Sequence, residues 1–351
     1  MSSSAPATRP TSVAAAASAT ASGHLPAELC LRIYDLMLRA RVLEDRLITM
    51  YKQGEGFFWI GGPGEEAFSV PLGLLVDKGQ GIHHDYLHLH YRSGGTLLAM
   101  GADPIDSIRQ MRNAATDPYS RGRNFVGHFS VRTWNVLPIT SPIAVQFAIG
   151  LGTARAQRAG TGARGITIVQ GGDAGTAEGD FATALVWSSR KGAELPMLML
   201  VMNNRYGIST PYAGQHGYEQ IAERGKAFGI QTAVVDGNDP ETSYAALARA
   251  IEYVRTERRP YLLEVMVSRL RGHSSASGAN LVKDEVDCLE RFEQALLDRQ
   301  LLTREDIDRS RERYTQEFAE AAKQVRSEPH PPPSAAWEHI FADKNLVGGE
   351  S

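Results

Sequence analysis

The first strong pattern along the chain is that of an amphipathic helix. Apolar side chains recur at spacings of three and four residues from Leu29 through Leu43 to Met50, which is the period of one helix face. The pattern starts after Leu25 and stops before Gly54. We therefore expect a long helix here, with one side buried against the body of the protein.

Strands and helices alternate through the centre of the chain. Short β-branched or apolar runs at residues 165–170, 196–202, 230–235 and 261–267 are interleaved with helical patterns at 178–191 and 240–254. Such alternation predicts an α/β fold with a mostly parallel sheet and helices on both faces. In such folds ligands bind at the carboxyl ends of the strands.

Two further regions have helical patterns. In residues 139–160, Thr140 and Ser141 are candidate caps, Pro142 stands at the expected first helical position, and small residues follow that favour a buried helix. Residues 282–326 are helical in pattern and highly charged, with Thr303 as a candidate cap. Between these regions, residues 271–280 form a polar Gly/Ser stretch that we expect to be a mobile loop.

The composition predicts one large folded domain between two tails. Residues 1–23 are rich in Ala, Ser and Thr and predict a disordered tail, with an organellar transit peptide as the alternative. Residues 24–326 form the expected α/β domain, and 327–351 form a Pro-rich C-terminal tail. No run approaches about 20 apolar residues, so we expect no membrane span. We expect a cytoplasmic protein, or a mitochondrial matrix protein if the first tail is a transit peptide.

Charge and cysteine content exclude several classes of site. The chain has 351 residues and a net charge of −3, so it lacks the basic surplus of a nucleic-acid-binding protein. Its two cysteines are too few for a thiolate zinc site or a disulfide framework. The stretch 81–92 holds four of the ten histidines and raises the alternative of a histidine metal site around His83 to His90.

Polar side chains follow two neighbouring predicted strands. Asp173 comes directly after the strand at 165–170, and Asn204 comes directly after the strand at 196–202. Adjacent parallel strands would bring these oxygens to one edge, where they suit Mg²⁺. The Tyr206 carbonyl is a third candidate ligand, and a helix that starts near Thr176 would direct its free amides at a diphosphate. No Gly-x-Gly-x-x-Gly motif follows a strand, which argues against a nicotinamide site.

Residues 171–211 resemble the thiamine-diphosphate motif in the α subunits of the decarboxylating component of 2-oxo acid dehydrogenases, of branched-chain or pyruvate type. The resemblance covers most of residues 27–341. It includes GEEA at 64–67, HYRSGG at 90–95, GRNFVGHF at 122–129, TSPIAVQ at 140–146, VDGND at 235–239 and RLRGHSS at 269–275. The fold that it implies is the thiamine-diphosphate-binding α/β fold.

The resemblance also implies a set of site residues, by position in its motifs. The implied metal ligands for Mg²⁺ are Asp173, Asn204 and Tyr206. The implied cofactor-binding residues are Tyr91, Arg92, Ile143, Gly172, Asp173, Ala174, Gly175, Asn204, Ile208 and His273. The implied catalytic residues are His273, Ser141 and His128. A potassium ion is a further alternative, because the site that some members have falls on Thr140, Pro142 and Gln146.

The implied activity is oxidative decarboxylation of a 2-oxo acid with transfer of the acyl group to lipoyl. Branched-chain substrates are favoured, and pyruvate or acetoin are the alternatives. The implied partners are a β subunit, in an assembly of two α and two β chains, and a lipoyl acyltransferase core.

The sequence departs from the family pattern at three places, of which Ala174 and the altered loop after His273 leave a non-catalytic binding or scaffolding subunit as an alternative. Ala174 replaces a glycine of the motif, and Val145 lacks the hydroxyl that branched-chain members offer to potassium. The stretch after Ser274, which matches the phosphorylated loop of some mitochondrial members, lacks the usual aspartate.

Overall fold

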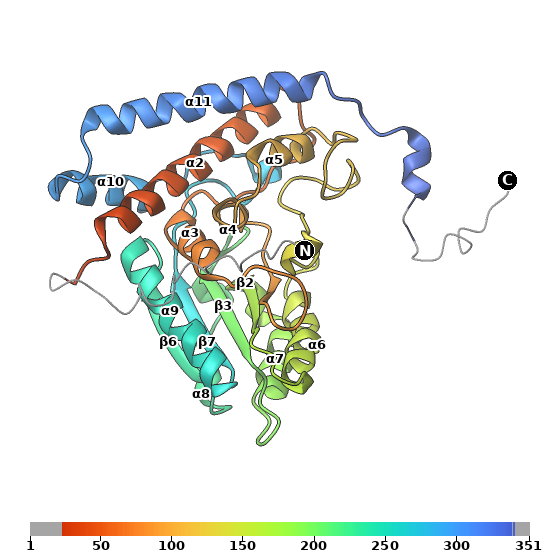
Figure 1. Cartoon of the computed structure of the whole chain (residues 1–351), viewed down its shortest axis with the longest axis vertical. Helices are drawn as coiled ribbons and strands as arrows, with labels where there is room; N and C mark the ends of the chain where they lie inside the picture. Colours follow the sequence, from red (N-terminus) through yellow and green to blue (C-terminus); the bar gives the residue numbers. More distant parts are fainter. Residues whose placement is uncertain (1–22, 339, 341–351) are drawn as a thin grey trace, which may run out of the picture.

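The protein is a parallel α/β sheet beneath a layer of long helices (Figure 1). The computed structural model describes residues 23–338 and 340. The strands are β1 (Tyr86–His88), β2 (Thr167–Gly172), β3 (Met197–Asn203), β6 (Gln231–Asp236) and β7 (Tyr261–Met266), with a small hairpin of β4 (Tyr206–Gly207) and β5 (Thr210–Pro211). The five-stranded sheet has the order β1-β2-β3-β7-β6, and all its pairs are parallel. The expected fold class is confirmed.

Helices cover both faces of the sheet and its upper end. The α-helices are α2 (Ala27–Lys52), α3 (Glu66–Leu75), α4 (Gly94–Ala99), α5 (Pro104–Met111), α6 (Val145–Ala159), α7 (Gly179–Ser188), α8 (Glu223–Lys226), α9 (Pro240–Glu257), α10 (Cys288–Asp298) and α11 (Arg304–Arg326). Short 3₁₀ turns are η1 (Arg132–Trp134), η2 (Ala174–Ala177), η3 (Tyr212–Gly214), η4 (Ser275–Ser277) and η5 (Pro333–Trp337). Figure 1 shows α11 lying along α2 above the sheet.

Strand β3 explains why the sheet has two covered faces. Its seven residues are all buried, and neighbouring side chains along it enter different cores. Met199 packs with α6 and α7, whereas Leu200 packs with α3 and α9. A central parallel strand buried on both faces has an unbroken apolar sequence, as this one does.

Helix α6 packs closely on the sheet, as its small residues predicted, but it starts later than expected. A Cβ atom added at Gly150 would lie 2.5 Å from a Val169 methyl group. The helix begins at Val145 because Ala144 has a left-handed backbone, with φ of 68°. Pro142 is therefore not the first helical residue, and no side chain caps this helix.

Other boundaries also differ from the sequence patterns. The expected helix near Thr176 is the 3₁₀ turn η2, and α7 starts only at Gly179. The region 282–326 becomes helical at Cys288 and is interrupted before Thr303, whose side chain forms a capping box with Asp306. The expected mobile loop is packed instead, because the Ser275 amide donates to the Trp59 carbonyl at 2.8 Å.

Both predicted tails extend beyond the described residues. Residues 1–22, with the expected disordered tail or transit peptide, lie outside the described part, as do 339 and 341–351. In the residues that the structure describes, no helix has the length and apolar character needed to cross a membrane.

Candidate functional site

A cavity of about 490 Å³ opens at the carboxyl ends of the central strands. It is lined by every predicted metal, cofactor and catalytic residue except Arg92 and Asn204, and of the potassium candidates it includes only Gln146. The predicted lining residues are Tyr91, His128, Ser141, Ile143, Gly172, Asp173, Ala174, Gly175, Tyr206, Ile208 and His273. The volume and the mixture of apolar and polar groups are those of a small-molecule site.

Asp173 and Asn204 follow paired strands at the same edge of the sheet. Gly172 on β2 is in register with Met202 on β3, and the Asp173 amide donates to the Met202 carbonyl at 3.1 Å. The Asn204 side-chain oxygen accepts a hydrogen bond from the Tyr206 amide at 3.1 Å. The predicted meeting of the two strand ends is therefore present.

The Asp173 carboxylate is buried with an unused oxygen. Asp173 is 1% exposed, and its Oδ2 atom has no hydrogen-bond partner. Burial raises the pKa of this carboxyl to about 6. A buried anion without a partner is unfavourable unless a cation or a donor joins it, so the group is suited to hold a cation.

The motif departure at Ala174 is accommodated by the neighbouring hairpin. Gly207 lies opposite, and a Cβ atom there would come within 2.7 Å of the Ala174 methyl group. Because Gly207 has no side chain, the methyl group of Ala174 fits without displacing the turn that carries Asp173.

Ser141 and His128 form a hydrogen-bonded pair in the cavity wall. The Ser141 hydroxyl lies 2.8 Å from His128 Nε2, while His128 Nδ1 faces the Val126 carbonyl at 3.4 Å. These partners assign the ring proton to Nδ1, so that the Ser141 hydroxyl donates to Nε2. Burial lowers the pKa of His128, which keeps the ring neutral at pH 7.

His273 joins the cavity to a buried arginine. Burial, followed by the nearby arginines, lowers the pKa of His273 to about 4, so this ring is also neutral. Arg92 donates from Nη2 to the His273 carbonyl at 2.9 Å and from Nη1 to the Gly61 carbonyl. The guanidinium of Arg92 is therefore engaged at the rim, and its contact with a cofactor stays a prediction.

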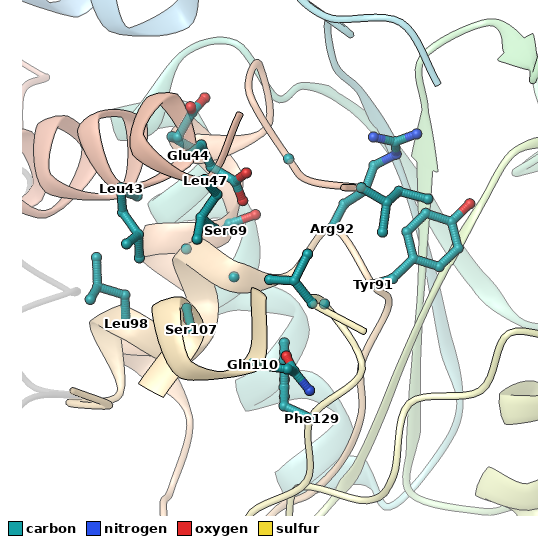
Figure 2. A pocket seen from close by; sticks show the side chains of 18 residues that line it. Leu43, Glu44, Leu47, Ser69, Tyr91, Arg92, Leu98, Ser107, Gln110 and Phe129 are labelled. Carbon is teal, nitrogen blue, oxygen red and sulfur yellow. The ribbon is translucent and has the colours of Figure 1, made fainter. Parts of the chain in front are cut away.

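A second, much smaller cavity lies behind Tyr91 and Arg92 (Figure 2). Its volume is about 30 Å³, which is enough for about one water molecule. Beside Arg92, the Glu65 carboxylate is buried with an unpartnered Oε2 atom, and burial raises its pKa to about 8. The space next to Arg92 therefore holds polar groups rather than a ligand-sized volume.

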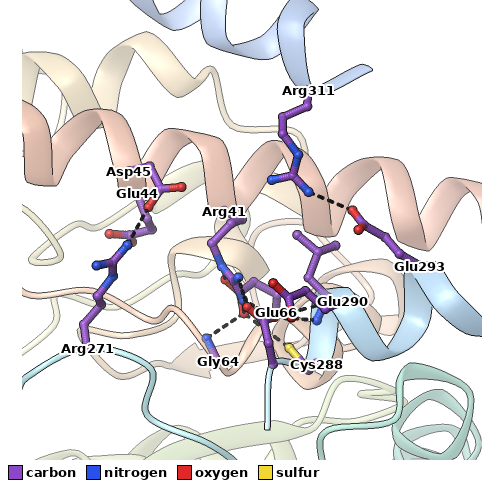
Figure 3. A network of polar contacts seen from close by, with 12 residues as sticks. Arg41, Glu44, Asp45, Gly64, Glu66, Arg271, Cys288, Glu290, Glu293 and Arg311 are labelled. Carbon is purple, nitrogen blue, oxygen red and sulfur yellow. Dashed lines mark hydrogen bonds and ion pairs between the residues drawn. The ribbon is translucent and has the colours of Figure 1, made fainter. Parts of the chain in front are cut away.

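A buried ion-pair network fixes the chain next to this region (Figure 3). Arg41 on α2 donates to Glu66 at 2.6 Å and to Asp287, the N-cap of α10, at 2.6 Å. The Gly64 amide donates to the same Glu66 carboxylate at 2.7 Å. The GEEA motif thus ties together three helices beneath the site.

Sequence reasoning gave no role to Arg269 or to two aromatic side chains. Arg269 has two buried nitrogens, Nε and Nη1, without a partner, and its guanidinium lies 5.2 Å from the Tyr206 ring centre. The sequence feature that could have pointed to Arg269 is its position, because it is a basic residue shortly after the end of a third strand, β7. Phe58 and Phe125 line the cavity with ring centres 4.8 Å apart, and no local pattern marks them.

The histidine-based metal site is not present among the described residues. No group of three or more His, Cys, Asp and Glu side chains in that part of the chain is placed to hold a metal ion. His88 Nε2 is 2.9 Å from the Thr153 hydroxyl, and His84 Nδ1 is 3.3 Å from Asp77. These rings serve separate hydrogen bonds because the strand that would align them, β1, ends at His88.

Comparison with known proteins identifies the family of the chain. The sequence profile of the family described as "Dehydrogenase E1 component" matches residues 34–334. The chain is 28% identical to the 2-oxoisovalerate dehydrogenase subunit alpha of Bacillus subtilis, over 88% of this chain and 94% of that protein. It is 26% identical to the human mitochondrial 2-oxoisovalerate dehydrogenase subunit alpha, over 91% of this chain and 72% of that protein. This protein belongs to the dehydrogenase E1 component family.

Proposed function

We propose that this chain is the α subunit of a 2-oxo acid dehydrogenase E1 component that binds Mg²⁺ and thiamine diphosphate and acts on branched-chain 2-oxo acids. The observation that carries the proposal is the buried Asp173 carboxylate, which has an unpartnered oxygen, lines a large cavity and follows β2 at the edge where Asn204 follows the paired strand β3. When bound, thiamine diphosphate supplies the carbanion and the electron sink for decarboxylation. Protein groups bind it, orient it and exclude water.

The residues present fit a magnesium diphosphate. Asp173 and Asn204 offer hard oxygen atoms, and the Tyr206 carbonyl is available from the β4 strand. Mg²⁺ commonly takes a few protein oxygens and completes its shell with phosphate oxygens and water. The unpartnered nitrogens of Arg269 and the ring of His273 offer donors for the phosphate oxygens.

The potassium alternative has one observation in its support. Gln146 Nε2 donates to the Gln170 carbonyl at 2.9 Å, while its buried Oε1 atom has no partner. Val145 still lacks the expected hydroxyl. Potassium is therefore a secondary part of the proposal.

The inner wall of the cavity favours an apolar substrate side chain. Phe58, Phe125 and the buried Ile60 are among its lining residues. The branched-chain preference agrees with the names of the relatives in Bacillus subtilis and human, which are 2-oxoisovalerate dehydrogenase subunits. Ser141 and the neutral His128 stand in the same wall and can hold or pass a proton near the reacting carbonyl.

The mouth of the cavity supports the requirement for a β subunit. Ile143 is 45% exposed and Ile208 is 58% exposed. Apolar side chains also stand outward on α6 and α7, at Ile149, Val186 and Trp187. Exposed apolar groups around a site mark a surface for a protein partner, which agrees with the β subunit that the resemblance implies. Acyl transfer to a lipoyl acyltransferase core is the last part of this proposal.

Calorimetry with thiamine diphosphate and Mg²⁺ tests the proposal. Asp173→Ala should abolish magnesium-dependent binding, because the variant removes the one unpartnered carboxylate oxygen of the site. Asp308→Ala, an exposed position on α11, is the control and should bind as the wild type does. Decarboxylation of 3-methyl-2-oxobutanoate and of pyruvate, and carbon–carbon cleavage of acetoin, each measured with the β partner, then separate the substrates. Binding that survives Asp173→Ala would refute the metal assignment, and no turnover with any substrate would favour a non-catalytic subunit.

A further inference from the structure

One wall of the cavity comes from a long loop without regular structure. The pocket loop, residues 112–129, connects α5 to the turn η1 and carries Phe125 and His128. Its backbone has positive φ at Asn113, Arg121 and two glycines. Left-handed backbone at non-glycine residues is unfavourable, so surrounding contacts must hold this shape.

Part of the hold comes from within the loop. Asp117 is 1% exposed, and its carboxylate accepts hydrogen bonds from the Tyr119 amide at 2.9 Å and the Ser120 amide at 3.0 Å. Gln110 on α5 donates to the His128 carbonyl at 2.6 Å. These contacts fix the middle of the loop and its C-terminal end, but they leave its outer side to other partners.

The outer side is held by the chain that follows α11. The C-terminal strap, residues 328–335, begins with Glu328, whose carboxylate pairs with both Arg109 Nε and Nη2 at 2.9 Å and accepts from Thr116. The Ala115 amide donates to the Pro329 carbonyl at 2.8 Å. Figure 1 shows the strap leaving the end of α11 on the side where α5 lies.

The far end of the strap is hydrogen-bonded to the pocket loop next to the cavity. Arg123 donates from Nε and Nη2 to the Ala335 carbonyl at 3.1 and 2.9 Å. Arg123 precedes Phe125 by only two residues. A Cβ atom at Gly122 would lie 3.0 Å from the Pro331 ring, so strap and loop also pack closely.

The strap has little else to hold it in place. Ala335 is its buried apolar residue, and the neighbouring Trp337 is 70% exposed. Its four prolines fix φ and reduce the conformational entropy that is lost on docking. A stiff segment whose polar contacts go to the end of α5 and to the loop that follows it is suited to set the position of that loop.

We propose that the C-terminal strap positions Phe125 and His128 in the cavity wall and thereby sets the affinity for the 2-oxo acid side chain. Glu328 and Arg123 are positioning residues in this scheme, since neither lines the cavity. The proposal rests on the proposed function for its substrate, but the hold on the loop is independent of it.

Hydrogen exchange and steady-state kinetics together test the proposal. Glu328→Gln and Arg123→Ala should each raise amide exchange across residues 119–128 by about tenfold. In the assembled enzyme they should raise KM for 3-methyl-2-oxobutanoate by about tenfold while kcat and thiamine diphosphate affinity change little. Arg123→Lys should raise KM less than Arg123→Ala does, because one donor can still reach the Ala335 carbonyl.

The matched control is Glu317→Gln on α11, which removes the charge that pairs with Arg39 on α2 and leaves the strap intact. It should change neither exchange in the loop nor KM. Unchanged loop exchange in both strap variants would overturn the proposal, and so would faster exchange without a rise in KM. If the wild type has no 2-oxo acid activity, the proposed function fails, and the exchange data alone decide whether the strap holds the loop.

Discussion

Replacing Asp173 by Asn should stabilise the metal-free protein while it removes the proposed metal ligand. The carboxylate is buried and its Oδ2 atom has no partner. Burial raises its pKa from 3.8 to about 6. This difference between the pKa values in the unfolded and folded states means that the charged carboxylate destabilises the folded protein by about 3 kcal/mol at neutral pH. Asn has the same shape without the charge, so up to about 3 kcal/mol should be regained.

The sign of the pH dependence follows from the raised pKa. Between about pH 4 and pH 6 the folded state binds more protons at Asp173 than the unfolded state does. The free energy of unfolding of the wild type therefore falls, through this group, as the pH rises through that range. The advantage of Asp173→Asn should be absent at about pH 4 and complete above about pH 6.

Urea unfolding of the metal-free chain at several pH values measures this difference. Asp308→Asn, an exposed change on α11, is the control and should show no such pH-dependent gain. Adding Mg²⁺ and thiamine diphosphate should stabilise the wild type by mass action and leave Asp173→Asn unchanged. If Asp173→Asn is no more stable than the wild type above pH 6, the carboxylate is not in an unfavourable environment and the reasoning is refuted.

Three further substitutions probe the network, the wall and the sheet. Glu66→Gln should lower the free energy of unfolding by about 3 kcal/mol in urea titrations, because it removes one charge of a buried ion pair; an unchanged midpoint would contradict this. Ser141→Ala removes the 2.8 Å hydrogen bond to His128. The loss of about 1 kcal/mol for one hydrogen bond corresponds to a fall of about fivefold in kcat/KM, while the cofactor affinity measured by calorimetry should not change. Gly150→Ala places a Cβ atom 2.5 Å from a β2 side chain and should cost about 1–3 kcal/mol in thermal unfolding, whereas Gly152→Ala, with open space around it, should not destabilise.

Hydrophobic patterning predicted the long first helix, the strands β2, β3, β6 and β7 and the order of their carboxyl ends, but it did not predict β1, the β4–β5 hairpin or α3 to α5. Burial on one or both faces leaves a periodic or unbroken apolar pattern, which is why β3 and α2 were predictable to within a few residues. Parallel pairing follows from the alternation of strands with helices. Asp173 and Asn204 could therefore be assigned to one edge, because each directly follows its own strand.

Tertiary structure decided what depends on residues far apart in the sequence. The Ser141 hydroxyl was expected to cap a helix but bonds to His128, since the left-handed Ala144 delays α6. The charge of Arg269 acts on Asp173 only because β7 pairs with β3. The hydrogen bond from Thr116 in the pocket loop to Glu328 joins segments more than 200 residues apart. Local patterns record burial and backbone preference, but a side chain's partner is set by the packing of whole elements, and that information exists only once the chain is folded.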